Sequence, residues 1–185
     1  MEGLKAIRRR NQLAPGTILF RGEPTPLSFD VIPGRGGGNR VIHDSGGLLV
    51  IAGSQSKTPP AKSLEYWLRA QARAAISKEI EVLSAKLKKW PGRLYLMSQR
   101  TRWGNCSAKG NLSFNWRLIM APGYVLKYLV THEVVHLAIP NHSKRYWLAV
   151  QSYCPDMEKA KRWLKDNHHL LQIDLAGFFE TKRKN

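Results

Sequence analysis

Residues 126–137 form an apolar segment that contains the sequence His132-Glu133-Val134-Val135-His136. Leucines and valines flank and fill this segment, which is typical of a helix buried inside a domain. A buried helix seldom carries two histidines and a glutamate unless something satisfies them, because unpaired polar groups are costly to bury. Any fold of this chain must therefore place these three side chains where a ligand or a hydrogen-bonding group can reach them.

The spacing of the two histidines favours a metal ion as that partner. Residues four apart on a helix lie one turn above each other on the same face, so His132 and His136 can bind one zinc ion. Glu133 is rotated by about 100° from His132, so it stands beside the ion and can act as general base for a zinc-activated water. The alternative is a pair of core histidines hydrogen-bonded to backbone carbonyls.

A catalytic zinc site needs a third protein ligand, and His142 is the candidate. A continuous helix would carry His142 about 9 Å beyond His136 and about 120° away from it. Pro140 ends the helix, because its ring clashes with a backbone carbonyl of the preceding turn and it lacks an N–H. Asn141 suits a turn and can cap the next helix. We therefore expect the chain to bend His142 back towards the metal.

The sequence offers a known spacing pattern and further histidines as alternatives to this ligand set. The distance from the two helical histidines to His142 matches the metzincin pattern, but Ile139 stands where that pattern has its glycine. The chain is therefore not assigned to the metzincins. His168 and His169 are rival ligands, although a pair near solvent on the last helix fits them better. His43 lies in a predicted hairpin without a partner motif.

The chain before this region is organised in strands and one long helix. Short β-rich segments separated by Pro and Gly are expected at residues 17–21, 27–32, 39–43 and 48–51. The glycine-rich residues 34–38 precede a strand-like segment and not a helix, so they predict a turn rather than a phosphate loop. Residues 61–89 predict a helix with one buried stripe. The stripe comprises Leu64, Leu68, Ala72, Ile76, Ile80, Leu83 and Leu87.

After the long helix we expect a strand, a β-hairpin and three helices. Their predicted ranges are 93–97 for the strand, 100–106 and 111–119 for the hairpin, and 124–138, 142–153 and 156–171 for the helices. The predicted fold class is α+β, with a strand-rich start, a long helix, a β-hairpin and a zincin-like helical C-terminal half. The predicted domains are a strand-rich N-terminal region (1–57), a zincin-like domain (58–180) and a basic tail (181–185).

The composition bears on partners and compartment. The 185 residues carry 30 Lys and Arg against 13 Asp and Glu, a formal net charge of +17. This excess favours a polyanionic partner or substrate, although a solvated basic surface explains it equally well. No apolar run approaches the roughly 20 residues of a membrane span, so no membrane partner is expected. Arg8-Arg9-Arg10 precedes no apolar core, so no signal peptide is expected, and Cys106 and Cys154 are expected to stay reduced in the cytoplasm.

Four motifs occur in an order that carries a resemblance to a known family. They are Thr101-Arg102-Trp103-Gly104-Asn105-Cys106-Ser107, Asn115-Trp116-Arg117-Leu118, His132-Glu133-Val134-Val135-His136-Leu137 and Asn141-His142-Ser143-Lys144. The chain resembles the YgjP-like metallopeptidase family, which is distantly similar to SprT-like proteases. The resemblance covers most of the chain and implies zinc on His132, His136 and His142, with Glu133 as base. Asn105, Val134-Val135 and Tyr146 depart from the usual Ser, Leu-Ala and Phe, and none of these removes an implied ligand.

The hairpin directly precedes the histidine helix, so its exposed edge can align an extended peptide by main-chain hydrogen bonds. Trp103, Asn115 and Trp116 would then line or support the substrate cleft, although a core role suits the tryptophans equally well. Four basic residues of the hairpin region could select acidic or nucleic-acid-associated substrates. They are Arg100, Arg102, Lys109 and Arg117.

Three functional hypotheses follow from these residues. The leading one is a zinc endopeptidase that hydrolyses a protein or peptide substrate. The alternative is a nucleic-acid-associated zinc protein, or a protease that acts on DNA- or RNA-bound proteins, with nucleic acid held by the basic surface. The third is a structural zinc module, which three histidines beside a glutamate disfavour, because structural sites are usually closed by cysteines. The sequence does not indicate the oligomeric state.

Overall fold

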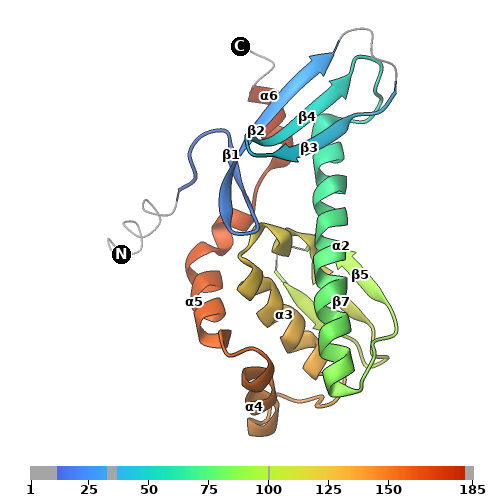
Figure 1. Ribbon diagram of the computed structural model, residues 1–185, viewed down its shortest axis with the longest axis vertical. Helices are drawn as coiled ribbons and strands as arrows, with labels where there is room; N and C mark the ends of the chain where they lie inside the picture. Colours follow the sequence, from blue (N-terminus) through green and yellow to red (C-terminus); the bar gives the residue numbers. More distant parts are fainter. Residues whose placement is uncertain (1–11, 33–36, 100, 182–185) are drawn as a thin grey trace.

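The structure is a computed structural model that describes residues 12–32, 37–99 and 101–181, with the side chain of Thr181 excepted. Most of the predicted basic N-terminus, most of the glycine-rich turn and the tail beyond residue 181 lie outside these ranges. The described part contains two small sheets and a set of helices (Figure 1), which confirms the predicted α+β class. Cys106 and Cys154 are both free thiols.

The N-terminal sheet has four strands in the order β1-β2-β4-β3. The strands are β1 (Thr17–Phe20), β2 (Glu23–Ile32), β3 (Arg40–Asp44) and β4 (Gly47–Gly53), which confirms four strands where four were predicted. β2 pairs with β4 in parallel, and the other two pairings are antiparallel. Gly47, the first residue of β4, has φ +115° and lies against the backbone of Pro26, so a side chain there would meet the neighbouring strand.

The long helix α2 (Pro60–Leu87) joins the N-terminal sheet to the rest of the molecule (Figure 1). Its apolar stripe faces the core as predicted, with Leu64, Leu68, Ala72 and Ile76 fully buried. Pro60 occupies the first helical turn, where its missing N–H costs nothing. Lys88 ends the helix in the left-handed conformation with φ 52°. The predicted boundary between residues 57 and 58 falls in the loop between β4 and α2.

The second sheet has three strands in the order β5-β7-β6. They are β5 (Leu94–Met97), β6 (Gly104–Cys106) and β7 (Leu112–Asn115), and β6 and β7 form the predicted antiparallel hairpin. The second hairpin strand is shorter than predicted. It stops at Asn115, whose side chain accepts a hydrogen bond from the N–H of Arg117 and starts the 3-10 helix η1 (Trp116–Met120). Apolar alternation alone does not reveal this local cap.

The C-terminal half consists of helices with bounds that differ in part from the prediction. The elements are α3 (Gly123–Val135), α4 (Lys144–Tyr153), α5 (Met157–Asn167), the 3-10 helix η2 (His168–Leu171) and α6 (Leu175–Thr181). α3 ends three residues before the predicted Ala138, and the predicted last helix divides into α5 and η2. α6 was not predicted. It packs against the N-terminal sheet, where the rings of Phe179 and Phe29 meet edge to face at 5.4 Å.

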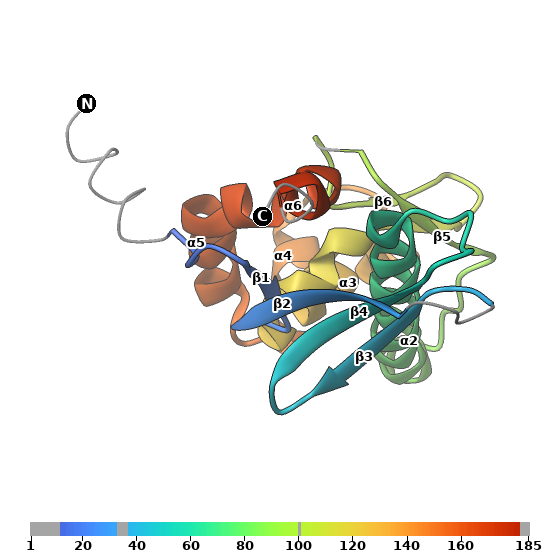
Figure 2. The ribbon, with the colours of Figure 1, turned by 90° about the horizontal axis from the view of Figure 1, so that it is seen from above.

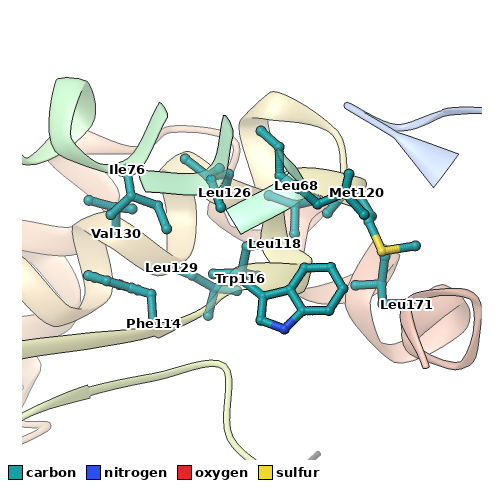
Figure 3. Close-up of a cluster of buried hydrophobic side chains, with 14 of the residues drawn as sticks. Leu68, Ile76, Phe114, Trp116, Leu118, Met120, Leu126, Leu129, Val130 and Leu171 are labelled. Carbon is teal, nitrogen blue, oxygen red and sulfur yellow. The ribbon is translucent and has the colours of Figure 1, made fainter. Parts of the chain in front are cut away.

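The hydrophobic core lies between α2, α3 and the second sheet. Figure 3 shows α2, β7, η1, α3 and η2 contributing side chains to one cluster around Trp116, which is only 1% exposed. A second part of the core lies under the N-terminal sheet, and Figure 2 shows α2 and α6 on the same side of that sheet. α3, which carries the histidine motif, is therefore held by packing along most of its length.

Candidate metal centre

The imidazoles of His132, His136 and His142 converge on one point. The Nε2 atom of His142 lies 3.2 Å from the Nε2 atoms of both His132 and His136. Ligand atoms of the three side chains lie within 4.8 Å of one another, and no other His, Cys, Asp or Glu group in the described ranges meets this criterion. Zinc–nitrogen bonds of about 2.0–2.1 Å in a tetrahedron place nitrogens roughly 3.3 Å apart. The three nitrogens are therefore spaced to hold one zinc ion.

A short turn brings the third histidine to the other two. α3 ends at Val135, and the N–H groups of Ala138 and Ile139 bond back to the carbonyl of Val135 before Pro140 leads the chain away. Asn141 was expected to cap the next helix. The structure assigns this role to Ser143, whose hydroxyl accepts from the N–H of Tyr146 at 3.4 Å. Residue 142 consequently precedes α4, and was wrongly placed in that helix by the sequence pattern.

The surroundings favour the neutral histidine, which is the form that binds a metal. Burial is the largest cause that lowers the pKa of His132 to about 4, and the neighbouring His136 and His142 add to it. The pKa of His136 is also lowered, chiefly by burial. The Nδ1 atom of His136 lies 3.1 Å from the carbonyl oxygen of Ile139. When Nδ1 donates this hydrogen bond, the lone pair of Nε2 is left for the ion.

Two aromatic residues of α4 pack around the histidines. Tyr146 is fully buried, and its ring stacks on His136 with centroids 4.5 Å apart. Its hydroxyl donates to the carbonyl oxygen of His132 at 2.8 Å, and burial raises its pKa. The hydroxyl is thus used in a hydrogen bond to the backbone of α3, which supports a packing role for Tyr146. Trp147 stacks on His142 at 5.5 Å and was not singled out in the sequence, because His142 precedes α4 and helical spacing does not relate the two residues.

Glu133 is buried beside the histidines and faces the strand β6. A Cβ on Gly104 would lie 2.6 Å from Oε1 of Glu133, so only glycine lets the strand come this close. Burial raises the pKa of Glu133 to about 7, and a hydrogen bond from the backbone N–H of Cys106 partly opposes this. A carboxyl group with a pKa near neutrality can give and take protons at physiological pH. Its position and its pKa both suit a general base.

A cavity of about 480 Å³ opens over this group. It is lined by Arg102, Trp103, Gly104, Asn105, Tyr128, Leu129, His132, Glu133, His136 and His142. All three imidazoles and the carboxylate are therefore accessible from the same cavity. Tyr128 and Leu129 were not predicted as site residues. They precede His132 by four and three residues, so the helical period alone places them on its face.

The three residues expected at the substrate cleft separate into two groups. Trp103 lines the cavity, whereas Asn115 and Trp116 do not. The side chain of Asn115 is fully buried and donates to the carbonyls of Gln99 and Arg102, at 2.6 and 3.4 Å. Trp116 lies in the core and donates to the hydroxyl of Ser98 at 3.2 Å. Both side chains therefore hold the segment that precedes β6, on the side of that segment that faces the core.

The two edges of the second sheet differ. On β6, the bond from the N–H of Asn115 to the carbonyl of Trp103 directs Trp103 and Asn105 towards β7. Because backbone groups alternate along a strand, those of Gly104 and Cys106 point away from β7. Gly104 lines the cavity, and the N–H of Cys106 bonds to Glu133. At the opposite edge, on β5, arginines of α2 cap the outward carbonyls. Arg73 donates to Leu94 and Arg69 to Leu96, both at 3.4 Å. The β5 edge is therefore covered by arginine side chains, and the β6 edge lines the cavity.

The rival histidines lie elsewhere. His43 packs between the rings of Phe20 and Trp67, with centroids 4.8 and 6.1 Å away. His168 and His169 lie in η2, and neither lines the cavity.

Comparisons with known proteins bear on the family. The model of the YgjP-like metallopeptidase domain matches residues 2–167, which is most of the chain. Searches of curated proteins and of solved structures gave no match. None of the helices in the described ranges is both long and apolar enough to cross a membrane. A metallopeptidase domain implies a protein or peptide substrate and a metal ion, and three converging imidazoles fit zinc. The chain therefore belongs to the YgjP-like family of metallopeptidase domains.

Proposed function

We propose that the protein is a zinc-dependent endopeptidase in which His132, His136 and His142 hold the metal and Glu133 is the general base. The observation that carries the proposal is the shared cavity, into which three imidazoles and one carboxyl group open together. Three ligands leave a fourth position for a water or a substrate, as catalytic zinc sites do. A purely structural zinc site would instead be closed by protein ligands.

Zinc in this position would supply Lewis acidity, which polarises the scissile carbonyl and makes a water acidic near neutral pH. Glu133 accepts the proton from the attacking water and delivers it to the leaving amine. The N–H of Cys106 holds the carboxylate in place for both transfers. Tyr146 and Trp147 keep the imidazoles from rotating, because their rings lie against His136 and His142.

The outward edge of β6 gives a reason to propose an extended peptide as substrate. Its main-chain groups at Gly104 are paired with no other strand among the described residues, and they lie beside Glu133. A substrate that adds as a strand to this edge would pass directly in front of the carboxylate. Since the cavity is open and not a closed pocket for a chain terminus, we propose cleavage within a chain.

The proposal is tested by comparing zinc-loaded wild type with Glu133→Gln on an unstructured protein substrate. Glutamine has the same shape but cannot accept the proton, so we expect turnover to fall by about 10²-fold or more. Mass spectrometry of the products distinguishes internal cleavage from trimming of the ends. Glu81→Gln, which removes an exposed carboxylate of α2, is the matched control and should retain full turnover. Equal activity of Glu133→Gln and wild type at matched zinc content would disprove the base assignment.

The nucleic-acid hypothesis stays a prediction that rests on the charge of +17. Several basic side chains of the described region are engaged in the fold. Arg69 and Arg73 cap β5, and the guanidinium of Arg117 lies 4.5 Å over the ring of Trp116. Binding to duplex and single-stranded oligonucleotides across a salt series tests the hypothesis. An affinity that falls steeply with salt would support a nucleic-acid-bound substrate, and absence of binding would leave a solvated basic surface.

A further inference from the structure

Of the four basic residues in the hairpin region, the structure distinguishes Arg102. Arg117 packs on Trp116 and donates to the carbonyl of Ser98 at 3.3 Å, so its charge is used within the fold. Lys109 is exposed in the turn between β6 and β7, outside the cavity, and Arg100 lies outside the described residues. Of the three that the structure describes, Arg102 alone lines the cavity that contains Glu133 and the histidines.

The charge of Arg102 is available to a ligand. Its side chain is exposed and forms no ion pair or hydrogen bond within the described ranges. Among the residues that line the cavity, Arg102 is the one permanent cation and Glu133 the one acid. A second nearby cation, Lys161, lies 4.4 Å over the ring of Trp147 and is paired with Glu158 at 2.9 Å. An anion that enters the cavity therefore meets Arg102 without a competing carboxylate other than the catalytic one.

The backbone of Arg102 is held in a defined place relative to the reacting groups. Its carbonyl oxygen accepts a hydrogen bond from the fully buried side chain of Asn115. It precedes Gly104 by two residues, and Gly104 touches Glu133. The chain bends at Trp103 before β6 begins at Gly104, and two residues of chain span at most about 7 Å, so Arg102 lies within about 7 Å of Gly104. A peptide paired with the edge of β6 covers the same distance in about two residues.

We infer that Arg102 is a specificity-determining residue that selects an acidic side chain within about two residues of the scissile bond. The inference rests on the proposed function, because it assumes a peptide on the edge of β6. A carboxylate suits the guanidinium, which can donate two parallel hydrogen bonds to it. A peptide is favoured over a nucleic acid because the cavity offers a single unpaired cation beside free main-chain groups, and not a track of cations.

The test uses peptides derived from a sequence that zinc-loaded wild type cleaves. Glu or its neutral isostere Gln is placed singly at each of three positions on either side of the scissile bond. We expect kcat/KM for the Glu peptide to exceed that for the Gln peptide by about tenfold at one position within about two residues of the bond. Arg102→Ala should reduce this ratio to about one, whereas Lys109→Ala, which removes a charge of the same hairpin outside the cavity, should preserve it.

A charge reversal and a binding measurement complete the design. Arg102→Glu should reverse the preference, so that Lys at the selected position is favoured over Glu. Fluorescence anisotropy of labelled peptides on Glu133→Gln protein measures the same Glu-to-Gln ratio as Kd, without requiring turnover. Equal kcat/KM and equal Kd for Glu and Gln at all six positions would overturn the inference while leaving the endopeptidase proposal intact. If zinc-loaded wild type cleaves no protein substrate, the proposed function fails instead. In that case a preference for Glu over Gln peptides in the anisotropy measurement that Arg102→Ala abolishes would still support binding of an acidic side chain at Arg102.

Discussion

At the residue scale, burial sets the properties of two ionisable side chains that α3 contributes to the cavity, Glu133 and His132. Glu133 is only 6% exposed, and His132 is half-buried, yet both open on the cavity. Burial acts on them in opposite directions, because it disfavours the charged form of each. The pKa of the carboxyl group rises to about 7 and that of the imidazole falls to about 4. In the metal-free protein burial therefore favours the neutral form of both side chains, and a neutral His132 does not repel an arriving cation.

The raised pKa of Glu133 predicts a pH dependence of stability in the metal-free protein. In the unfolded chain the carboxyl group has its ordinary pKa of 4.5, and in the folded state burial raises this pKa to about 7. Folding thus favours the protonated form, and its stabilising contribution is lost as the pH rises through 7. Between pH 5 and pH 8 we expect wild type to lose about 2 to 3 kcal/mol of unfolding free energy relative to Glu133→Gln. Urea unfolding of both proteins at both pH values measures this difference, and parallel curves would contradict it.

Loss of the third ligand should weaken metal binding. We expect His142→Ala to lower zinc affinity by about 100-fold or more, because two ligands remain and the helix alone cannot supply a third. Competition with a chelator of known affinity measures the change. His168→Ala is the matched control, since this exposed histidine of η2 lies outside the cavity. Undiminished affinity of His142→Ala would remove residue 142 from the ligand set.

At the scale of elements, the site depends on how closely β6 approaches α3. The contact of Gly104 with Glu133 brings the outward edge of the strand to the carboxylate that we propose as general base. The hairpin was predicted from its turn, but its distance from the helix was not. The sequence around Gly104 does not indicate which helix this glycine will contact in the folded protein. This contact arises only when the sheet packs on α3, through side chains far apart in the sequence.

Gly104→Ala tests the importance of this approach. Its Cβ would lie 2.6 Å from Oε1 and 2.7 Å from Cγ of Glu133, so either the strand or the carboxylate must move. We expect a fall in kcat/KM of at least about tenfold and a loss of stability of about 1–3 kcal/mol. Gly38→Ala, with nothing within 4 Å of its Cβ, is the control. Unchanged kinetics and unfolding of Gly104→Ala would show that the strand adapts freely.

At the scale of the whole molecule, local patterns predicted the elements that have a strong period and missed those that depend on distant contacts. The four N-terminal strands, α2 and the histidine helix follow from apolar periodicity, and the turn to His142 follows from Pro140. α6 has only seven residues, too few for a helical period to be distinctive. It is stabilised by the contact of Phe179 with Phe29 in the N-terminal sheet, more than a hundred residues earlier in the chain.

The remote position of α6 predicts that its loss affects stability but not metal binding. Phe179 is 6% exposed and packs on the N-terminal sheet, at the end of α2 away from α4 (Figure 1). We expect Phe179→Ala to lower the unfolding free energy by about 3–5 kcal/mol while zinc affinity stays unchanged. Leu148→Ala, at a side chain that is 57% exposed, should have little effect on stability. A loss of zinc affinity in Phe179→Ala would indicate that the two ends of the molecule are coupled.

The unequal edges of the second sheet have a consequence for solubility. Exposed strand edges can recruit strands from other copies of the same chain, and this is a route to aggregation. The arginines of α2 remove that hazard along β5. The edge that stays accessible belongs to β6, which is three residues long. A three-residue edge can form main-chain hydrogen bonds with one added peptide. It offers too few such bonds to hold successive copies of the chain in a growing sheet. The second sheet thus leaves one short edge open to a partner strand.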